Sequence, residues 1–225
     1  MRRMLAVIVM AWPALAGAQE PALTTEKDKL SYAMGMDLGT QLRTRSVDID
    51  PALFGQGLKD ALSGGRTLLT ADEAREAIAG LQRAMVVKMA EAARLAGEKN
   101  KAEGEAFLAA NKAKEGVVTL PSGLQYKVLK AGEGRKPTEA DTVEVHYRGT
   151  LVDGTEFDSS YGRGQPQKMP VRGLIKGWTE ALPLMPVGSK WQLVVPPELA
   201  YGERGTKAIG PNATLVFELE LLAIQ

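Results

Sequence analysis

The chain has 225 residues, a formal net charge of +1, one histidine and no cysteine. The lack of cysteine excludes disulfides, thiolate zinc sites and a cysteine nucleophile. Basic and acidic residues balance in both halves of the chain, so neither half shows the clustered positive charge typical of a nucleic-acid-binding protein. We therefore expect no nucleic-acid partner, and we expect stability to come from packing and from association between chains.

The first twenty residues, MRRMLAVIVMAWPALAGAQE, have the order of a secretory signal peptide. Arg2 and Arg3 precede an apolar run that ends near Ala16, and a small-x-small step at 16–18 follows. We predict a signal peptide over residues 1–18, cleaved near Ala18, and a periplasmic or otherwise exported protein. An uncleaved membrane anchor is the alternative. The run is shorter than the roughly 20 residues that a spanning helix needs, so we expect no stable membrane span.

The chain after this leader has helical periodicity as far as about residue 115. A four-residue spacing predicts a first helix, with its apolar stripe at Leu30, Met34, Leu38 and Leu42. Asp50 followed by Pro51 is typical of an N-cap and first turn, so a second helix is expected to end near residues 63–65. Thr70 and Glu73 fit a capping box that opens a long third helix. Gly97 and Gly104 weaken its continuation, which we expect to run to about residue 114 with a bend or break.

These helices carry small, Ala- and Met-rich apolar faces, which make a thin core for a separate domain. We therefore predict that residues 19–117 form a helical dimerisation domain and long linker helix, and that two chains interleave their helices. A monomeric helical cap packed on the second domain is the alternative.

Beyond Gly116 the periodicity changes to alternation, and eight of the 12 aromatic residues lie in this part. Alternation predicts strands around residues 124–128, 143–147, 191–195 and 215–221. Four or five strands with abundant Gly and Pro favour a curved antiparallel sheet. The stretch GWTEAL, residues 177–182, is expected to form a short enclosed helix that stops near Pro183. The fold class is therefore α+β, with residues 118–225 as the sheet domain.

The polar residues of this second half support no familiar hydrolytic or metal chemistry. His146 is the only imidazole, and alternation places it opposite Val145 and Tyr147, away from the apolar face. Asp153, Glu156 and Asp158 match no metal-ligand spacing, and Asp153-Gly154 is typical of a hairpin turn. Residues 201–210 lack the ending of a phosphate loop, so we expect neither a metal nor a cofactor. What remains is an apolar set that forms either an ordinary core or a pocket: Tyr147, Phe157, Trp178, Tyr201, Ile209 and Phe217.

Four segments in this half occur in a recognisable order: HYRGTLVDGTEFDSS, LIKGW, VPPELAYG and GPNATLVFELELL. Together they resemble the FKBP-type peptidyl-prolyl cis-trans isomerases, and the resemblance spans about residues 120–224. The helical half, through KLSYAMGMDLG, ALFGQGLKDAL and FLAANKAKEGVVTLPSGLQY, is similar to the exported, dimeric branch typified by macrophage infectivity potentiator.

The resemblance implies isomerase activity on proline-containing polypeptides that are unfolded or folding, with chaperone activity from the dimer. A chaperone or binding module with a weakly active pocket is the alternative. It also implies a pocket formed by Tyr147, Phe157, Asp158, Arg163, Leu174, Ile175, Trp178, Tyr201, Ile209 and Phe217. Trp178 would form the floor, with Tyr147, Phe157 and Phe217 as walls. The N–H of Ile175 and the hydroxyl of Tyr201 would bond substrate carbonyls, and Tyr147 and Arg163 would hold Asp158.

The sequence departs from the family pattern at two places. Gln167 and Met169 occupy a stretch where the family often has an aromatic residue, and the loop 202–210 lacks a histidine that some members carry. Both departures bear on substrate preference and on the binding of macrolide inhibitors, which the resemblance also implies.

Overall fold

The computed structural model describes residues 23–225, which form two compact units. The first unit ends at Glu73 and the second runs from Ala74 to Gln225. The predicted signal peptide and its cleavage site lie outside the described residues. The boundary that the sequence places after residue 117 stays a prediction.

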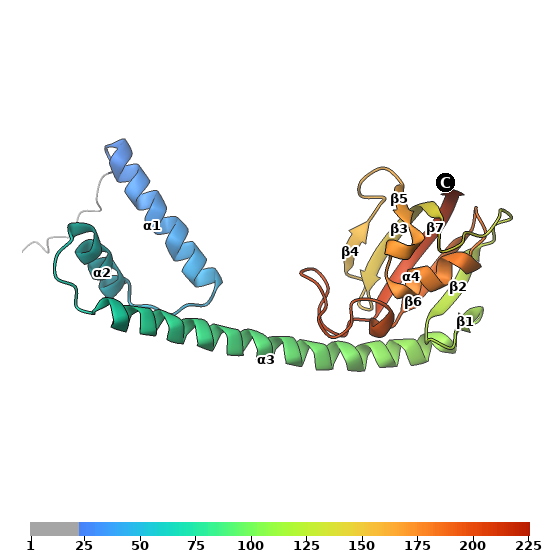
Figure 1. Ribbon diagram of the computed structural model, residues 1–225, viewed down its shortest axis with the longest axis horizontal. Helices are drawn as coiled ribbons and strands as arrows, with labels where there is room; N and C mark the ends of the chain where they lie inside the picture. Colours follow the sequence, from blue (N-terminus) through green and yellow to red (C-terminus); the bar gives the residue numbers. More distant parts are fainter. Residues whose placement is uncertain (1–22) are drawn as a thin grey trace, which may run out of the picture. The chain divides into compact units, whose positions relative to one another are not determined.

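Two helices, α1 and α2, lie in the first unit (Figure 1). Side-chain caps fix where each of them begins. Helix α1 spans Glu26–Thr44 and helix α2 spans Pro51–Ser63. The Asp50 carboxylate accepts hydrogen bonds from the N–H groups of Ala52 and Leu53 at 2.7 and 3.1 Å, as an N-cap does. The predicted N-cap at Asp50 is confirmed.

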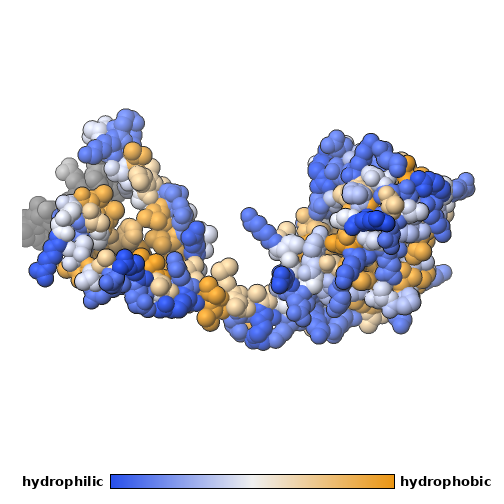
Figure 2. Space-filling view, in the orientation of Figure 1, coloured by the Kyte–Doolittle hydropathy of each residue, from blue (hydrophilic) through white to orange (hydrophobic). Residues whose placement is uncertain are grey.

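Among residues 23–225, the apolar stripe of α1 remains largely exposed. Leu30 and Met34 are 63% and 65% exposed, and neither α1 nor α2 contains a buried residue. Figure 2 shows hydrophobic residues gathered at the surface of this unit. Since folding requires apolar burial to offset conformational entropy, these two helices lack the core that would stabilise them alone.

Helix α3 is one continuous helix, Ala71–Lys112. Its start is capped as predicted, because the Thr70 hydroxyl accepts from the N–H of Glu73 at 3.2 Å and the Glu73 carboxylate accepts from the N–H of Thr70 at 2.8 Å. The helix continues through Gly97 and Gly104, which the sequence marked as weak points. Both glycines are buried, and their role is to admit close packing.

The last third of α3 packs on the sheet domain through these glycines and through two amides. A Cβ at Gly104 would overlap Oγ1 of Thr214 and lie 3.1 Å from its Cβ. Asn100 donates to the carbonyl oxygen of Pro211 at 2.8 Å. Asn111, which is buried, donates to the Gln125 side chain at 2.9 Å. This part of α3 therefore belongs to the packed body of the second unit.

We expect Gly104→Ala to destabilise the sheet domain by about 1–3 kcal/mol, because the added methyl group overpacks the contact with Thr214. Urea unfolding followed by tryptophan fluorescence measures the effect. The matched control is Gly80→Ala in the same helix, where the new Cβ meets only Nη2 of Arg83 at 3.9 Å. That substitution gains helix propensity and is not expected to destabilise. Equal behaviour of the two variants would contradict the packing role.

The second unit is built on one antiparallel sheet of seven strands in the order β1-β2-β6-β7-β3-β4, with β5 also paired to β3. The strands are β1 Val117–Thr119, β2 Gln125–Lys130, β3 Thr142–Leu151, β4 Glu156–Ser159, β5 Gln167–Pro170, β6 Lys190–Val195 and β7 Leu215–Ile224. Alternation predicts only four or five, because β1, β4 and β5 have three or four residues each. A strand that short contains too few alternations to be recognised.

One short helix, α4 Lys176–Ala181, lies on the buried face of this sheet (Figure 1). The chain then makes a short 3-10 turn, Leu182–Leu184, because Pro183 cannot continue the helix. Along β3 and β7 buried residues alternate with partly exposed ones, which confirms the predicted periodicity. Six helical residues cannot cover a sheet of this width, so aromatic side chains on either side of α4 complete the core.

Candidate functional site

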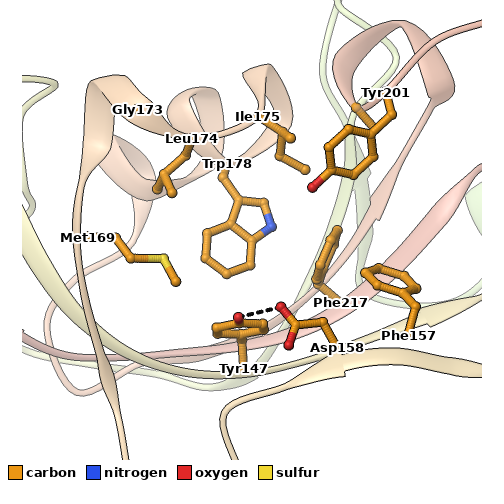
Figure 3. Close-up of a pocket in the computed structure, with 11 residues that line it drawn as sticks. Tyr147, Phe157, Asp158, Met169, Gly173, Leu174, Ile175, Trp178, Tyr201 and Phe217 are labelled. Atoms are coloured by element: carbon orange, nitrogen blue, oxygen red, sulfur yellow. Dashed lines mark hydrogen bonds between the residues drawn. The ribbon is translucent and has the colours of Figure 1, made fainter. Parts of the chain in front are cut away.

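A cavity of about 410 Å³ opens beside α4, over strands β3, β4, β5 and β7 (Figure 3). Its lining comes from four strands, from α4, from the segment just before α4 and from the loop after β6, so no single segment of the sequence contains it. The lining residues are Tyr147, Phe157, Asp158, Met169, Gly173, Leu174, Ile175, Trp178, Ala200, Tyr201 and Phe217.

The aromatic side chains of the cavity meet edge to face. The Trp178 ring lies 5.2 Å from the Tyr147 ring and 5.2 Å from the Phe217 ring, with interplanar angles of 83° and 81°. Phe157 meets Phe217 in the same way at 5.7 Å. Such T-shaped pairs are favourable and hold each ring at a fixed angle. Trp178 is 4% exposed, so it forms a rigid apolar floor.

Gly149 on β3 makes room for two of these rings. A Cβ at this position would lie 2.7 Å from Cζ of Phe157 and 2.8 Å from Cε1 of Phe217. Gly149 pairs with Asp158 on β4 and with Phe217 on β7. The glycine therefore lets side chains from the two neighbouring strands fold over the middle strand.

Three polar groups form a closed hydrogen-bonded triangle at the cavity wall. The Tyr147 hydroxyl donates to Oδ2 of Asp158 at 2.6 Å (Figure 3). Arg163 donates to Oδ1 of Asp158 at 2.6 Å and to the Tyr147 hydroxyl oxygen at 2.7 Å. The carboxylate thus has a partner on each oxygen, which satisfies the requirement for a charge next to apolar surface.

The same contacts set the ionisation of the triangle. Burial opposes the charge on Asp158, but the hydrogen bonds from Tyr147 and Arg163 outweigh it and lower the pKa of the carboxyl group. Burial, reinforced by the bond to Asp158, raises the pKa of Tyr147 above its ordinary value of 10.0. The bond to Asp158 likewise raises the pKa of Arg163. At neutral pH the triangle is therefore a carboxylate, a phenol and a guanidinium.

We expect the activity of this cavity to be constant from about pH 5 to pH 9, because no group in the triangle titrates in that range. Asp158 has a lowered pKa in the folded chain, so its stabilising contribution is present above about pH 4 and is lost as the pH falls through the lowered value. A pH profile of kcat/KM measures this. An inflection between about pH 6 and 7, where histidine ordinarily titrates, would contradict it.

The structure brings eight of the ten predicted pocket residues to the cavity lining. Arg163 is not in the lining, but it bonds to two lining residues from the loop between β4 and β5. Ile209 is buried in the core and does not line the cavity. In Figure 3 the Tyr201 hydroxyl points toward the cavity.

Sequence reasoning missed three lining residues as pocket members: Met169, Gly173 and Ala200. Gly173 and Ala200 directly adjoin the predicted residues Leu174 and Tyr201. This adjacency in the sequence was the only signal that could have placed them in the pocket. Met169 was noted only as a replacement for an aromatic residue. It lines the cavity because β5 pairs with the first half of β3, where Met169 faces Val143.

His146 does not contribute to the cavity. Its Nδ1 lies 2.9 Å from the Ser160 hydroxyl and its ring stacks on Tyr161 at 4.6 Å. The lining itself contains no serine, histidine or lysine. Among residues 23–225, no group of three or more histidine, aspartate or glutamate residues could hold a metal ion. The cavity can therefore bind a small apolar group and orient it with a few hydrogen bonds.

Two family models together match nearly all the described residues. The model described as FKBP-type peptidyl-prolyl cis-trans isomerase matches residues 133–222. The model described as the domain amino-terminal to FKBP-type peptidyl-prolyl isomerase matches residues 27–128.

Curated relatives match over most of their length. The chain is 46% identical to the outer membrane protein MIP of Legionella longbeachae, over 94% of this chain and 91% of that protein. It is 45% identical to the FKBP-type 22 kDa peptidyl-prolyl cis-trans isomerase of Escherichia coli K12, over 91% and 98%. Among solved structures, FkpA from Escherichia coli matches with a TM-score of 0.71 and 35% identity, over 91% of this chain and 99% of that one.

Proposed function

The chain belongs to the family of FKBP-type peptidyl-prolyl cis-trans isomerases, and we propose that it accelerates X-Pro rotation in exported proteins while they fold. The aromatic cavity with the Tyr147–Asp158–Arg163 triangle is the observation that supports the assignment of the site. Its substrate is a polypeptide with proline, and the proline ring is the apolar group that the cavity receives.

The reaction requires no nucleophile, because no covalent bond breaks. Rotation about a peptide bond has a barrier of about 18–20 kcal/mol, which comes from resonance in the C–N bond. X-Pro bonds therefore isomerise in tens to hundreds of seconds without a catalyst. At the twisted transition state the amide loses resonance, its carbonyl becomes less polar and the prolyl nitrogen becomes pyramidal. A dry apolar cavity favours that less polar state over the planar amide, and each tenfold acceleration needs about 1.4 kcal/mol.

Each part of the site has a role in this proposal. Trp178 lies under the proline ring, and Tyr147, Phe157 and Phe217 enclose it. The N–H of Ile175 and the Tyr201 hydroxyl donate to substrate carbonyls on either side. Ile175 is fixed for this role because its carbonyl accepts the N–H groups of Trp178 and Thr179 at 2.9 and 3.1 Å. Asp158 and Arg163 hold the Tyr147 ring in place, and a macrolide would occupy the same cavity as a competitive inhibitor.

We also assign the uncovered first unit to a homodimer. A groove of about 450 Å³ runs between α1 and α2 and is lined by Leu38, Leu42, Ile49 and Phe54 together with Gly35 and Gly39. A Cβ at either glycine would meet nothing within 4 Å, so a helix of a second copy can approach closely there. The exposed leucine and methionine side chains of α1 supply the apolar area that such an interface needs.

We further propose that the protein is exported and that it acts as a chaperone. The leader sequence favours export, and one relative is named an outer membrane protein. Within residues 23–225, no helix has the length and hydropathy to span a bilayer. A dimer presents two proline sites to one unfolded chain, which supports a chaperone role for the whole protein. A chaperone with a weakly active pocket is the second candidate, favoured by the apolar surface of the first unit.

A fragment that begins at Ala74 separates the two activities. It keeps the contacts of α3 with the sheet domain, so we expect it to be monomeric and to isomerise a short proline peptide as fast as the full chain. We expect it to lose most of its ability to prevent aggregation of an unfolded protein. Light scattering, a peptide assay and a turbidity assay measure these properties.

The outcomes of this comparison discriminate between the candidates. If the fragment remains dimeric, the assigned interface is wrong. If it suppresses aggregation as well as the full chain, the dimer has no part in chaperone activity. If neither form accelerates isomerisation, the protein is mainly a binding module.

A further inference from the structure

Ser160 is a buried polar residue that the proposed reaction does not use. It directly follows β4, it is 0% exposed, and it lies outside the cavity lining. Its hydroxyl oxygen accepts a hydrogen bond from the N–H of Tyr147 at 2.8 Å, and its own N–H donates to the carbonyl oxygen of Tyr147 at 2.9 Å. One residue therefore holds both main-chain groups of Tyr147.

The Ser160 hydroxyl takes the place of a main-chain partner in the sheet. In an antiparallel ladder, two residues that face each other as a hydrogen-bonded pair exchange both of their N–H···O bonds. Tyr147 and Ser160 make one of these bonds through the main chain, and the hydroxyl supplies the other. The carbonyl oxygen of Ser160 is thereby free to accept from the N–H of Arg163 at 3.2 Å, which closes a turn over residues 160–163. The serine therefore ends the ladder and turns the chain at the same point.

This turn brings Arg163 back to Tyr147 and Asp158. Asp158 lies two residues before Ser160, and Arg163 lies three residues after it. A strand that simply continued would place residue 163 about 16 Å from residue 158, which is beyond the reach of the two side chains. With the turn, the guanidinium donates to Oδ1 of Asp158 at 2.6 Å and to the Tyr147 hydroxyl at 2.7 Å. The triangle at the cavity wall therefore depends on the chain reversal that begins at Ser160.

His146 and Tyr161 support the same turn. Nδ1 of His146 lies 2.9 Å from the Ser160 hydroxyl, and the carbonyl oxygen of Tyr147 lies farther from it, at 3.2 Å. The imidazole ring stacks on Tyr161, the residue after Ser160, with centroids 4.6 Å apart. The hydroxyl oxygen can accept from the Tyr147 N–H whether its own proton points to the imidazole or to that carbonyl. The contact with Tyr147 therefore does not depend on the charge of His146, in agreement with an activity that stays constant near neutral pH.

We propose that Ser160 is a positioning residue for the reaction. Its hydroxyl fixes the main chain of Tyr147 and starts the turn that returns Arg163, so that the phenol, the carboxylate and the guanidinium meet beside the proline ring. Ser160 does not touch the substrate, and it acts only through the triangle. This inference rests on the proposed function in that the triangle serves isomerisation, but the positioning itself can be measured without an activity assay.

Carbon-13 NMR titration of the Asp158 carboxyl group tests the positioning directly. Burial opposes ionisation of this group, but the hydrogen bonds from Tyr147 and Arg163 outweigh it and hold its pKa below the ordinary value of 3.8. Ser160→Ala removes the hydroxyl, so we expect these bonds to loosen and the pKa of Asp158 to rise toward the ordinary value. Ser159→Ala is the matched control. Ser159 pairs with Arg148 in the ladder, so loss of its hydroxyl is expected to leave the pKa of Asp158 in place.

A comparison of single and double variants tests whether Ser160 acts through the triangle. Ser160→Ala is expected to lower kcat/KM for a short proline peptide by about threefold to tenfold, whereas Ser159→Ala leaves it unchanged. In the Asp158→Ala background the triangle is already broken, so Ser160→Ala is expected to lower kcat/KM by less than about twofold. Ser160→Cys keeps the size of the side chain but is only a weak acceptor. It is expected to act in the same direction, and it replaces the alanine variant if that variant does not fold.

The outcomes separate this inference from the proposed function. The positioning role is overturned if a folded variant at position 160 has the same pKa of Asp158 as the unmodified protein, or the same kcat/KM. It is also overturned if Ser160→Ala lowers kcat/KM equally with and without Asp158, since the serine would then act outside the triangle. If the unmodified protein does not accelerate isomerisation, the proposed function fails, and the pKa of Asp158 still decides whether Ser160 positions the triangle.

Discussion

Trp178→Ala is expected to remove nearly all acceleration of proline isomerisation and to lower the free energy of unfolding by about 3–5 kcal/mol. The ring is buried and makes edge-to-face contacts with Tyr147 and Phe217. Its loss leaves a void under the proline ring and releases two walls of the cavity. A peptide isomerisation assay and urea unfolding measure the two effects on the same preparation.

Trp178→Phe tests the role of this ring in the reaction separately from its role in stability. It keeps an aromatic ring at the position, so we expect a smaller loss of stability and partial activity. The account of the site is contradicted if Trp178→Ala remains folded at the assay temperature and turns over the peptide at the rate of the unmodified protein.

Asp158→Ala is expected to lower kcat/KM by about tenfold to a hundredfold while the domain stays folded. The substitution leaves the Tyr147 hydroxyl and the Arg163 guanidinium without their shared acceptor, and an unpaired group costs about 1–3 kcal/mol. The Asp158 side chain is 43% exposed, so water can satisfy part of this need and global stability changes little. Tyr147→Phe removes the same bond from the other side and is expected to act in the same direction.

Glu156→Ala is the matched control on the same strand. Glu156 is paired with Arg148 at 2.6 Å and does not line the cavity, so its loss is expected to leave kcat/KM unchanged. Equal activity of the Asp158 and Glu156 variants would show that the triangle has no part in the reaction.

Local features of the sequence were enough to predict where α2 and α3 begin. The caps at Asp50 and at Thr70 with Glu73 depend on residues within one turn, and the structure has both. Gly97 and Gly104 were misread as weak points because their contribution depends on contacts that are not local. Their benefit comes from Pro211, Asn212 and Thr214, which are distant in the sequence, and helix propensity does not include such contacts.

The site shows the same division between local and long-range information. Alternation placed Tyr147 and Phe217 on the buried face of their strands. It left open whether they form an ordinary core or a pocket with Trp178 and Tyr201, and only the family resemblance favoured the pocket. Met169 could not be placed from the sequence, because its strand has four residues and its register depends on pairing with β3. The stacking of Tyr126 on Trp191 could not be predicted from the sequence either, since the two rings meet only through the pairing of β2 with β6.

The most direct test of the account is the rate of cis-trans exchange in a short proline peptide, measured with the full-length protein and increasing amounts of a macrolide. We expect the protein to accelerate exchange, and the macrolide to return the rate to its uncatalysed value. In the NMR spectrum, the indole N–H signal of Trp178 is expected to shift, whereas that of Trp191, which does not line the cavity, is expected to stay in place. Acceleration that persists once the Trp178 signal shows the cavity to be filled would contradict the assignment of this cavity as the catalytic site.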